Sequence, residues 1–394
     1  MASHSQTSLV DPQLQRKGFG LKEQIKEQLV QEYHSDIIYK IQAAGNQMTL
    51  GDITFHLASS FGFCYGVDRA VDLAYETRKR FPDKKIYLTA QIIHNPRVNN
   101  NLEKMGVRFV TNFDAIGTDD VVILPAFGAS VNEVETLKKK GCVLVDTTCG
   151  SVLNVWKRVE SYAADGFTSI IHGKVYHEET QATSSRVSTY PEGEYLIVLN
   201  REEAKIVCDY IREKGTKTEF LKKFSKAVSP GFDPDRDLAH IGVANQTTML
   251  MSESLRIAED IKEAMIDRYG TEEVATRFRN FDTICSATED RQNAVVNMKN
   301  DKLDLMIVVG GFNSSNTTNL AKMASSFVTS YHIDGVDCVL SPHELRHKPP
   351  SQFEPVIAKD WLPNGPLQIG ITSGASTPNQ VLGEVVEKIT SFRK

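Results

Sequence analysis

Three cysteines each stand where an apolar, strand-like run ends and a segment with helical spacing begins. They are Cys64, Cys149 and Cys285, and the same strand–cysteine–helix pattern surrounds all of them. A thiolate at such a junction faces the helix N-terminus, where the dipole and the free N–H groups favour an anion. Any one of these cysteines alone would fit a buried core position better, but the threefold repetition favours a shared role.

The spacing of these cysteines limits the kind of centre they could form. They lie 85 and 136 residues apart, whereas a compact zinc knuckle needs paired ligands roughly two to four residues apart. The spacing therefore favours three lobes that each supply one thiolate to a common centre. Three thiolates without an obvious fourth would leave one iron of an iron–sulfur cluster open for chemistry. The remaining cysteines lie inside apolar runs and are expected in the core: Cys142, Cys208 and Cys338.

The charge balance and the cysteine usage narrow the class of protein. The 394-residue chain has a formal net charge of −5, so it lacks the basic excess of a general nucleic-acid binder. No apolar run approaches the roughly 20 residues of a membrane span, and the N-terminal residues lack the apolar stretch of a secretory signal. Cysteines without the close, even spacing of a secreted scaffold favour a reducing compartment. The N-terminal residues carry Asp11 and are not Arg-rich, so a plastid transit peptide is not indicated, and we expect a bacterial cytoplasmic location rather than the plastid stroma, with no membrane and no nucleic-acid partner.

Short apolar runs alternate with amphipathic helical segments from residue 51 to the C-terminus. This alternation predicts parallel α/β units, and runs that are apolar throughout predict sheets covered on both faces. We expect an N-terminal helical extension over residues 1–50, with a helix over 21–45 that ends at Gly45. The remainder shows a weak internal threefold repeat. We divide it into three α/β lobes, over residues 51–146, 147–283 and 284–394.

Small polar side chains gather in the loops that follow the predicted strands. In parallel sheets these loops meet at the carboxyl edge, where ligands bind. Hydroxyl, amide and histidine groups beside helix N-termini form a cradle for a phosphate or a diphosphate. Helix capping explains any single loop better, but segments 313–318 and 372–377 carry more such groups than one cap uses. The candidate residues are His94, His177, Glu178, Glu179, Thr247, Ser314, Ser315, Asn316 and Ser376.

Segment 177–180 places two glutamates among otherwise neutral polar side chains. A carboxyl group near an anionic ligand has a raised pKa and could deliver protons. A solvated helix start would use glutamates equally well. The chain has no GxxxxGK[ST] loop and no convincing GxGxxG after its first strand, so a bound nicotinamide cofactor is not indicated.

Eight short motifs follow one another from about Asp52 to the C-terminus: GFCYGV, QIIHNP, DTTCG, HEET, NQTT, TICSATEDRQ, GGFNSSNT and TSGAS. Each is weak alone, but in this order they resemble the 4-hydroxy-3-methylbut-2-enyl diphosphate reductase (IspH/LytB) family. The N-terminal extension is similar to that of the longer cyanobacterial and plastid branch. The resemblance implies reductive dehydroxylation of 4-hydroxy-3-methylbut-2-enyl diphosphate to isopentenyl and dimethylallyl diphosphate, the last step of the non-mevalonate isoprenoid pathway.

The same resemblance implies a pseudo-threefold trefoil of α/β lobes around one 4Fe–4S cluster. Cys64, Cys149 and Cys285 would hold three irons, and the open iron would bind the allylic oxygen of the substrate. Glu179 would donate a proton, and Thr247 would help to hold the substrate hydroxyl. An external carrier, a ferredoxin or a flavodoxin, would supply the electrons. The diphosphate would be bound by His94, His177, Ser314, Ser315, Asn316 and Ser376.

One position departs from the family pattern. Where much of the family has Ala-His-Gly, this chain has Ala126, Phe127 and Gly128, and a phenylalanine donates no hydrogen bond to a phosphate. A charge-assisted hydrogen bond contributes about 1.5–3 kcal/mol, so we expect a nearby residue to compensate.

Two other functions compete with this interpretation. A non-catalytic iron–sulfur sensor could bind a cluster and a regulatory anion, but the hydroxyl-rich loops and Glu179 favour a substrate site. A zinc hydrolase with three cysteine ligands is disfavoured because catalytic zinc usually takes histidine or glutamate among its ligands.

Overall fold

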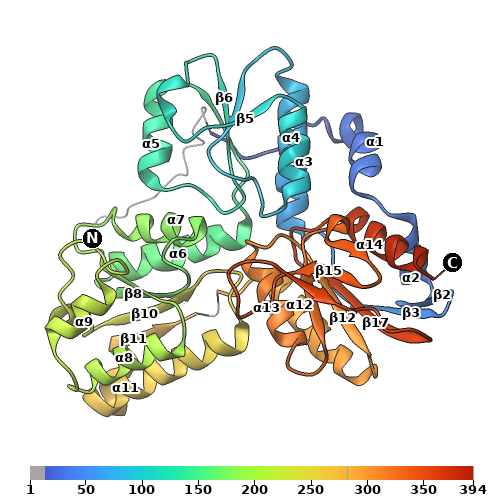
Figure 1. Cartoon of the computed structure of the whole chain (residues 1–394). Coiled ribbons are helices and arrows are strands. Elements are labelled where there is room, and N and C mark those ends of the chain that lie inside the picture. Colours follow the sequence, from blue (N-terminus) through green and yellow to red (C-terminus); the bar gives the residue numbers. More distant parts are fainter. Residues whose placement is uncertain (1–13, 282, 394) are drawn as a thin grey trace.

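Three sheets with helices packed against them divide the chain into three α/β lobes (Figure 1). The structure, a computed structural model, describes residues 14–281 and 283–393. The three sheets are parallel apart from one edge strand, as the alternation of apolar and helical segments predicts. Five strands, all at inner positions of these sheets, are buried along their whole length, which fits sheets covered on both faces.

The first lobe is a five-stranded parallel sheet with helices α3 (Tyr65–Arg80), α4 (Pro96–Lys104) and α5 (Val131–Lys140). Local sequence sets the bounds of α5: Ser130 and Glu133 form a capping box, and Gly141 ends the helix in the left-handed region at φ 75°. The strands lie in the order β1 (Leu14–Gln15), β7 (Val143–Asp146), β6 (Val121–Leu124), β4 (Ile86–Leu88) and β5 (Val107–Phe109).

The second lobe is a four-stranded parallel sheet in the order β11 (Phe278–Asn280), β10 (Ile241–Asn245), β8 (Thr168–His172) and β9 (Tyr195–Val198). Its centre is apolar, with buried Ile, Val, Leu and Phe side chains from both the sheet and the helices. The helices are α6 (Gly150–Ala164), α7 (Glu178–Val187), α8 (Arg201–Ile211), α9 (Lys217–Phe224), α10 (Pro234–Asp237) and α11 (Met251–Arg277).

The third lobe has strand order β13 (Ser330–Ile333), β12 (Leu305–Val309), β17 (Leu367–Ser373), β3 (Ile53–Leu57) and β2 (Gln47–Leu50). Its helices are α12 (Ser286–Asn297), α13 (Ser315–Ala324) and α14 (Asn379–Ser391). A separate antiparallel sheet is formed by β14 (Val339–Ser341), β15 (Glu344–His347) and β16 (Val356–Lys359).

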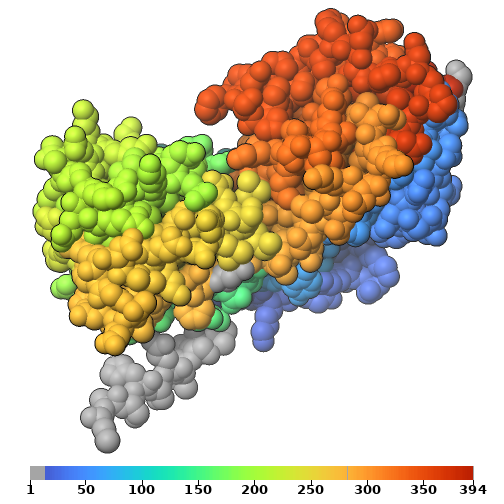
Figure 2. All heavy atoms as spheres, turned by 90° about the horizontal axis from the view of Figure 1, so that it is seen from below, coloured from blue at the N-terminus to red at the C-terminus, as the bar shows by residue number. Residues whose placement is uncertain are grey.

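The strand β3 does not belong to the lobe in which the sequence places it. The predicted first lobe begins at residue 51, but β3 hydrogen-bonds in parallel to β17, with Ile53 opposite Leu367. In the space-filling view, blue residues from the N-terminal part of the chain lie against the orange and red third lobe (Figure 2). An apolar run identifies a strand but not its neighbour in the sheet, which explains the difference.

The N-terminal extension is integrated into two lobes. Strand β1 pairs with β7, and α1 (Lys22–Tyr33) packs against α3. Helix α2 (Asp36–Ala43) buries Ile38 and Ile41 in the core of the third lobe. The predicted single helix over 21–45 is wrong, because the backbone is extended between α1 and α2. The part of the expected extension over residues 1–13 lies outside the described residues.

Candidate active site

The three cysteines occupy equivalent positions, one at the start of a helix in each lobe. Cys64 is the N-cap of α3, Cys149 of α6 and Cys285 of α12, all with extended backbone. None of them caps its helix through a side-chain hydrogen bond. The three sulfurs therefore stand at positive helix ends without being used by the helix, as the sequence pattern predicts.

Close packing brings these cysteines together. A side chain at Gly66 would collide with the Cys149 sulfur and approach the Cys64 sulfur within 3.9 Å. The Cys64 thiol interacts electrostatically with both Cys149 and Cys285. All three are free and partly buried. Burial raises the pKa of the Cys64 thiol and raises that of Cys285 to about 11, so a cationic partner would be needed to hold them as thiolates.

Arg291 provides part of that positive charge. It is 4 % exposed, donates from Nη2 to the Gly62 carbonyl at 2.7 Å and from Nη1 to the Ala287 carbonyl at 2.8 Å. Its charge opposes the burial effect on the pKa of Cys64. Its buried Nε has no hydrogen-bond partner among the described residues. Three thiols, three helix N-termini and an unpaired guanidinium N–H together fit an anionic iron–sulfur group.

Glu179 lies at the start of α7 and is 1 % exposed. Its Oε1 accepts from the Thr247 backbone N–H at 2.6 Å, and its Oε2 accepts from the Thr247 hydroxyl at 2.9 Å. Burial raises the pKa of Glu179 to about 7, although both hydrogen bonds oppose the rise. The side chain can therefore hold or release a proton near neutral pH. It interacts electrostatically with Cys285, so this proton is near the cysteine centre.

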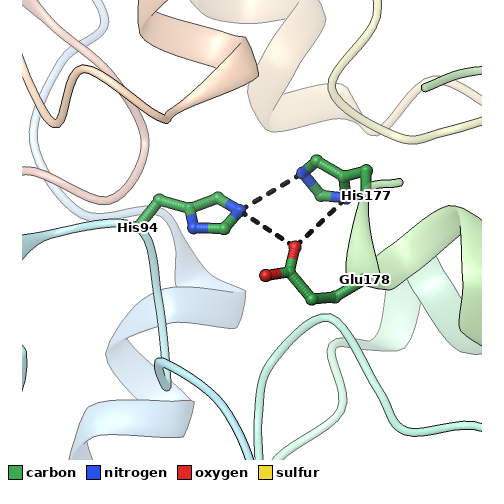
Figure 3. A group of neighbouring side chains, drawn as sticks. All are labelled: His94, His177 and Glu178. Atoms are coloured by element: carbon green, nitrogen blue, oxygen red, sulfur yellow. Dashed lines mark hydrogen bonds and ion pairs between the residues drawn. The ribbon is translucent and has the colours of Figure 1, made fainter. Parts of the chain in front are cut away.

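His94 and His177 face each other across the boundary between the first and second lobes (Figure 3). Their Nε2 atoms are 3.2 Å apart. Burial lowers the pKa of His177 to about 3, so its ring is neutral. Because its Nδ1 accepts from the Glu179 N–H at 3.2 Å, its hydrogen is on Nε2 and faces His94. Glu178 lies 3.8 Å from His94 and 4.0 Å from His177 and is 42 % exposed.

The third lobe contributes hydroxyl and amide groups from the start of α13. Ser314 caps that helix by accepting from the Thr317 N–H at 3.2 Å, so the capping role applies to it. Asn316 bridges two segments: its Oδ1 accepts from the Ala375 N–H at 3.0 Å, and its Nδ2 donates to Thr288 at 3.4 Å. Thr288 in turn lies 3.0 Å from the Cys285 sulfur. The polar loops and the cysteine centre thus form one connected site.

Ser315, Ser376 and Phe127 differ in what they contact. Ser315 accepts a hydrogen bond from Lys174 Nζ at 2.9 Å. Ser376 is partly buried beside Ala375, and its hydroxyl makes no hydrogen bond with any residue of 14–281 and 283–393. Phe127 stacks on His94 with ring centroids 4.2 Å apart and contacts His177 edge-on at 5.7 Å. The Phe127 ring therefore packs against both histidines and adds no hydrogen-bond donor.

Sequence reasoning missed Lys174, Thr288 and Arg291. Lys174 is a single lysine in a loop, which usually means a solvated side chain. Thr288 and Arg291 are inside the predicted helix after Cys285, where polar residues are common. The available signal for Thr288 and Arg291 was their spacing, three and six residues after the cysteine, on the first two turns of α12.

Comparisons with known proteins find relatives that match most of this chain. The model of the LytB protein family matches residues 55–390. A 4-hydroxy-3-methylbut-2-enyl diphosphate reductase of Thermosynechococcus vestitus is 51% identical over 385 residues, covering 96% of this chain and 94% of the relative. The reductase of the same name from Nostoc is 49% identical over the same shares.

Solved structures also match. The E-1-hydroxy-2-methyl-but-2-enyl-4-diphosphate reductase of Plasmodium falciparum superposes with a TM-score of 0.65 at 25% identity, covering 86% of this chain and 89% of that one. No helix in the described part of the chain has the length and apolar character to cross a membrane. With a family model matched over most of its length and relatives near 50% identity, the chain belongs to the LytB protein family.

Proposed function

We propose that this protein reduces 4-hydroxy-3-methylbut-2-enyl diphosphate to isopentenyl and dimethylallyl diphosphate, the last step of the non-mevalonate pathway. One observation carries the proposal: three free cysteines, the buried Glu179, and the histidines and hydroxyl groups of the polar loops lie in one connected site. Relatives named 4-hydroxy-3-methylbut-2-enyl diphosphate reductase match nearly the whole chain. Two electrons and two protons enter, and the hydroxyl leaves as water.

Cys64, Cys149 and Cys285 would hold one 4Fe–4S cluster, with one iron left open for the substrate. The repeated strand–cysteine–helix junction supports this ligand set and a pseudo-threefold relation of the lobes. When bound, such a cluster supplies single electrons and a Lewis-acid iron. Arg291 would hold the Gly62 loop beside Cys64 and balance thiolate charge.

His94, His177, Ser314, Ser315, Asn316 and Ser376 would bind the diphosphate. The His177 Nε2–H, which faces His94 here, would donate to a phosphate oxygen instead. The charge of Lys174 lowers the pKa of both histidines and favours an anion beside them.

Thr247 would orient both Glu179 and the substrate hydroxyl. Because Thr247 donates to the carboxyl group through its N–H and its hydroxyl, the proton-bearing group is fixed at one place. Glu179 would deliver the proton that lets the hydroxyl leave as water. A ferredoxin or a flavodoxin would supply the electrons. The cytoplasmic location stays a prediction, and the cyanobacterial relatives favour it.

The direct test is turnover under anaerobic conditions with a low-potential reductant. We expect the reconstituted protein to convert the hydroxylated diphosphate to both products, measured by chromatography of the dephosphorylated alcohols. A protein that binds iron but gives neither product would contradict the proposal and favour a sensor. A colourless protein with stoichiometric zinc after the same reconstitution would contradict both the reductase activity and the iron–sulfur centre.

The rate should also depend on pH through Glu179. Burial raises its pKa to about 7, so the protonated form prevails below that pH and is lost above it. We therefore expect kcat to fall tenfold per pH unit well above pH 7, on a limb absent from Glu179→Gln. The measurement is the pH profile of kcat at saturating substrate. If the wild type and Glu179→Gln both lost kcat over the same pH range, the titrating group would be a residue other than Glu179.

A further inference from the structure

Lys174 is directed into the centre of the site by a tight turn after β8. The preceding Gly173 has no room for a side chain, because a Cβ there would lie 2.8 Å from the Thr180 hydroxyl. The Lys174 backbone N–H donates to Gln246 Oε1 at 3.1 Å. Its Nζ crosses to the third lobe and donates to the Ser315 hydroxyl at 2.9 Å. The ammonium therefore occupies the start of α13, beside the hydroxyl loop.

The charge around Lys174 is unbalanced. The side chain is half-buried, and neither Lys174 nor Lys348 forms an ion pair with a carboxylate within residues 14–281 and 283–393. Lys348 lies near enough to lower the pKa of Lys174, and its Nζ donates to the Phe312 carbonyl at 2.8 Å. Lys174 in turn lowers the pKa of both His94 and His177.

Two helix N-termini add to this positive field. Ser315, which Lys174 contacts, is the first residue of α13, and His177, whose N–H donates to the Lys174 carbonyl at 3.0 Å, is the N-cap of α7. The aromatic ring of Phe127 contributes no donor to the pair of histidines it covers. Two lysines without a carboxylate partner beside the start of α13 favour an anionic ligand at this place.

We propose that Lys174 binds the diphosphate of the substrate directly, supplying the donor and charge that Phe127 does not. This inference rests on the proposed function, since the anion is that of its substrate. The ammonium would keep its contact with Ser315 and share a phosphate oxygen with it and with the His177 Nε2–H. Lysine acts as a point charge for phosphate, so no bidentate geometry is required.

The test compares Lys174→Met with Lys174→Arg in the cluster-loaded enzyme. Loss of one charge-assisted contact should raise KM for the diphosphate about 10- to 100-fold in Lys174→Met, with kcat changed much less. Lys174→Arg keeps the charge and should retain most of the affinity. The matched control is Lys322→Met, an exposed lysine near the other end of α13, which should leave KM unchanged.

A shortened substrate separates charge recognition from a structural effect. The KM increase in Lys174→Met should be several-fold smaller for the corresponding monophosphate than for the diphosphate. Three results would overturn the inference while wild-type turnover persists. The KM of Lys174→Met could rise equally for the monophosphate and the diphosphate, or it could stay unchanged. The KM of Lys174→Arg could rise as much as that of Lys174→Met. A wild-type enzyme that does not convert the diphosphate would overturn the proposed function together with this inference.

Discussion

Glu179→Gln is expected to lower kcat by about 10²- to 10⁴-fold, the usual contribution of a positioned general acid. Glutamine preserves the shape of the side chain and can still accept from the Thr247 N–H, but it carries no transferable proton. Iron content and substrate affinity should therefore stay close to those of the wild type. Anaerobic turnover together with a binding titration measures both quantities.

Glu202→Gln is the matched control for this variant. Glu202 is the second residue of α8, as Glu179 is of α7, and both helices follow a strand of the same sheet. Glu202 is exposed, so its replacement should leave kcat unchanged. If Glu179→Gln retained the wild-type rate, the proton would have to come from elsewhere, for instance from the diphosphate itself.

Replacing any one of the three junction cysteines by alanine should remove most of the bound iron and abolish turnover. Each comes from a different lobe, so none has a neighbouring cysteine that could take its place. The wild type should hold about four irons per chain after anaerobic reconstitution. Iron assay and the visible absorption band report the loss independently of activity.

Cys208→Ala is the control for the cysteine variants. Cys208 is 2 % exposed in the apolar core of the second lobe, and burial raises the pKa of its thiol to about 12. Its replacement should cost some stability but no iron. A variant of Cys64, Cys149 or Cys285 that kept the full iron content would remove that residue from the ligand set.

The sequence predicts the strand–cysteine–helix junctions and the polar loops of this protein better than it predicts which strands pair in each sheet. The strand–cysteine–helix units and the polar loop residues follow from local patterns, because strand ends and helix starts are read within a few residues. The structure brings His94, His177, Glu179 and Thr247 into one contact chain, as expected for loops at the same sheet edges.

What could not be predicted depends on contacts distant in sequence. The apolar run of β3 indicates a strand, but its pairing with β17 is set by packing of the third core. The break between α1 and α2 follows from Ile38 and Ile41 turning into that same core, against helix propensity. The contact of Lys174 with Ser315 joins residues that are 141 positions apart, so no local pattern indicates it.

The pairing of β3 with β17 also has a consequence for how the chain folds during synthesis. The third sheet joins residues 53–57 to residues 367–371, so it cannot close until almost the whole chain has left the ribosome. The first and second lobes have strands that lie closer together in sequence and can form earlier. Until β17 is made, one edge of β3 stays unpaired just ahead of Cys64. Aggregation through that edge, or oxidation of the Cys64 thiol, would then prevent assembly of the cysteine centre.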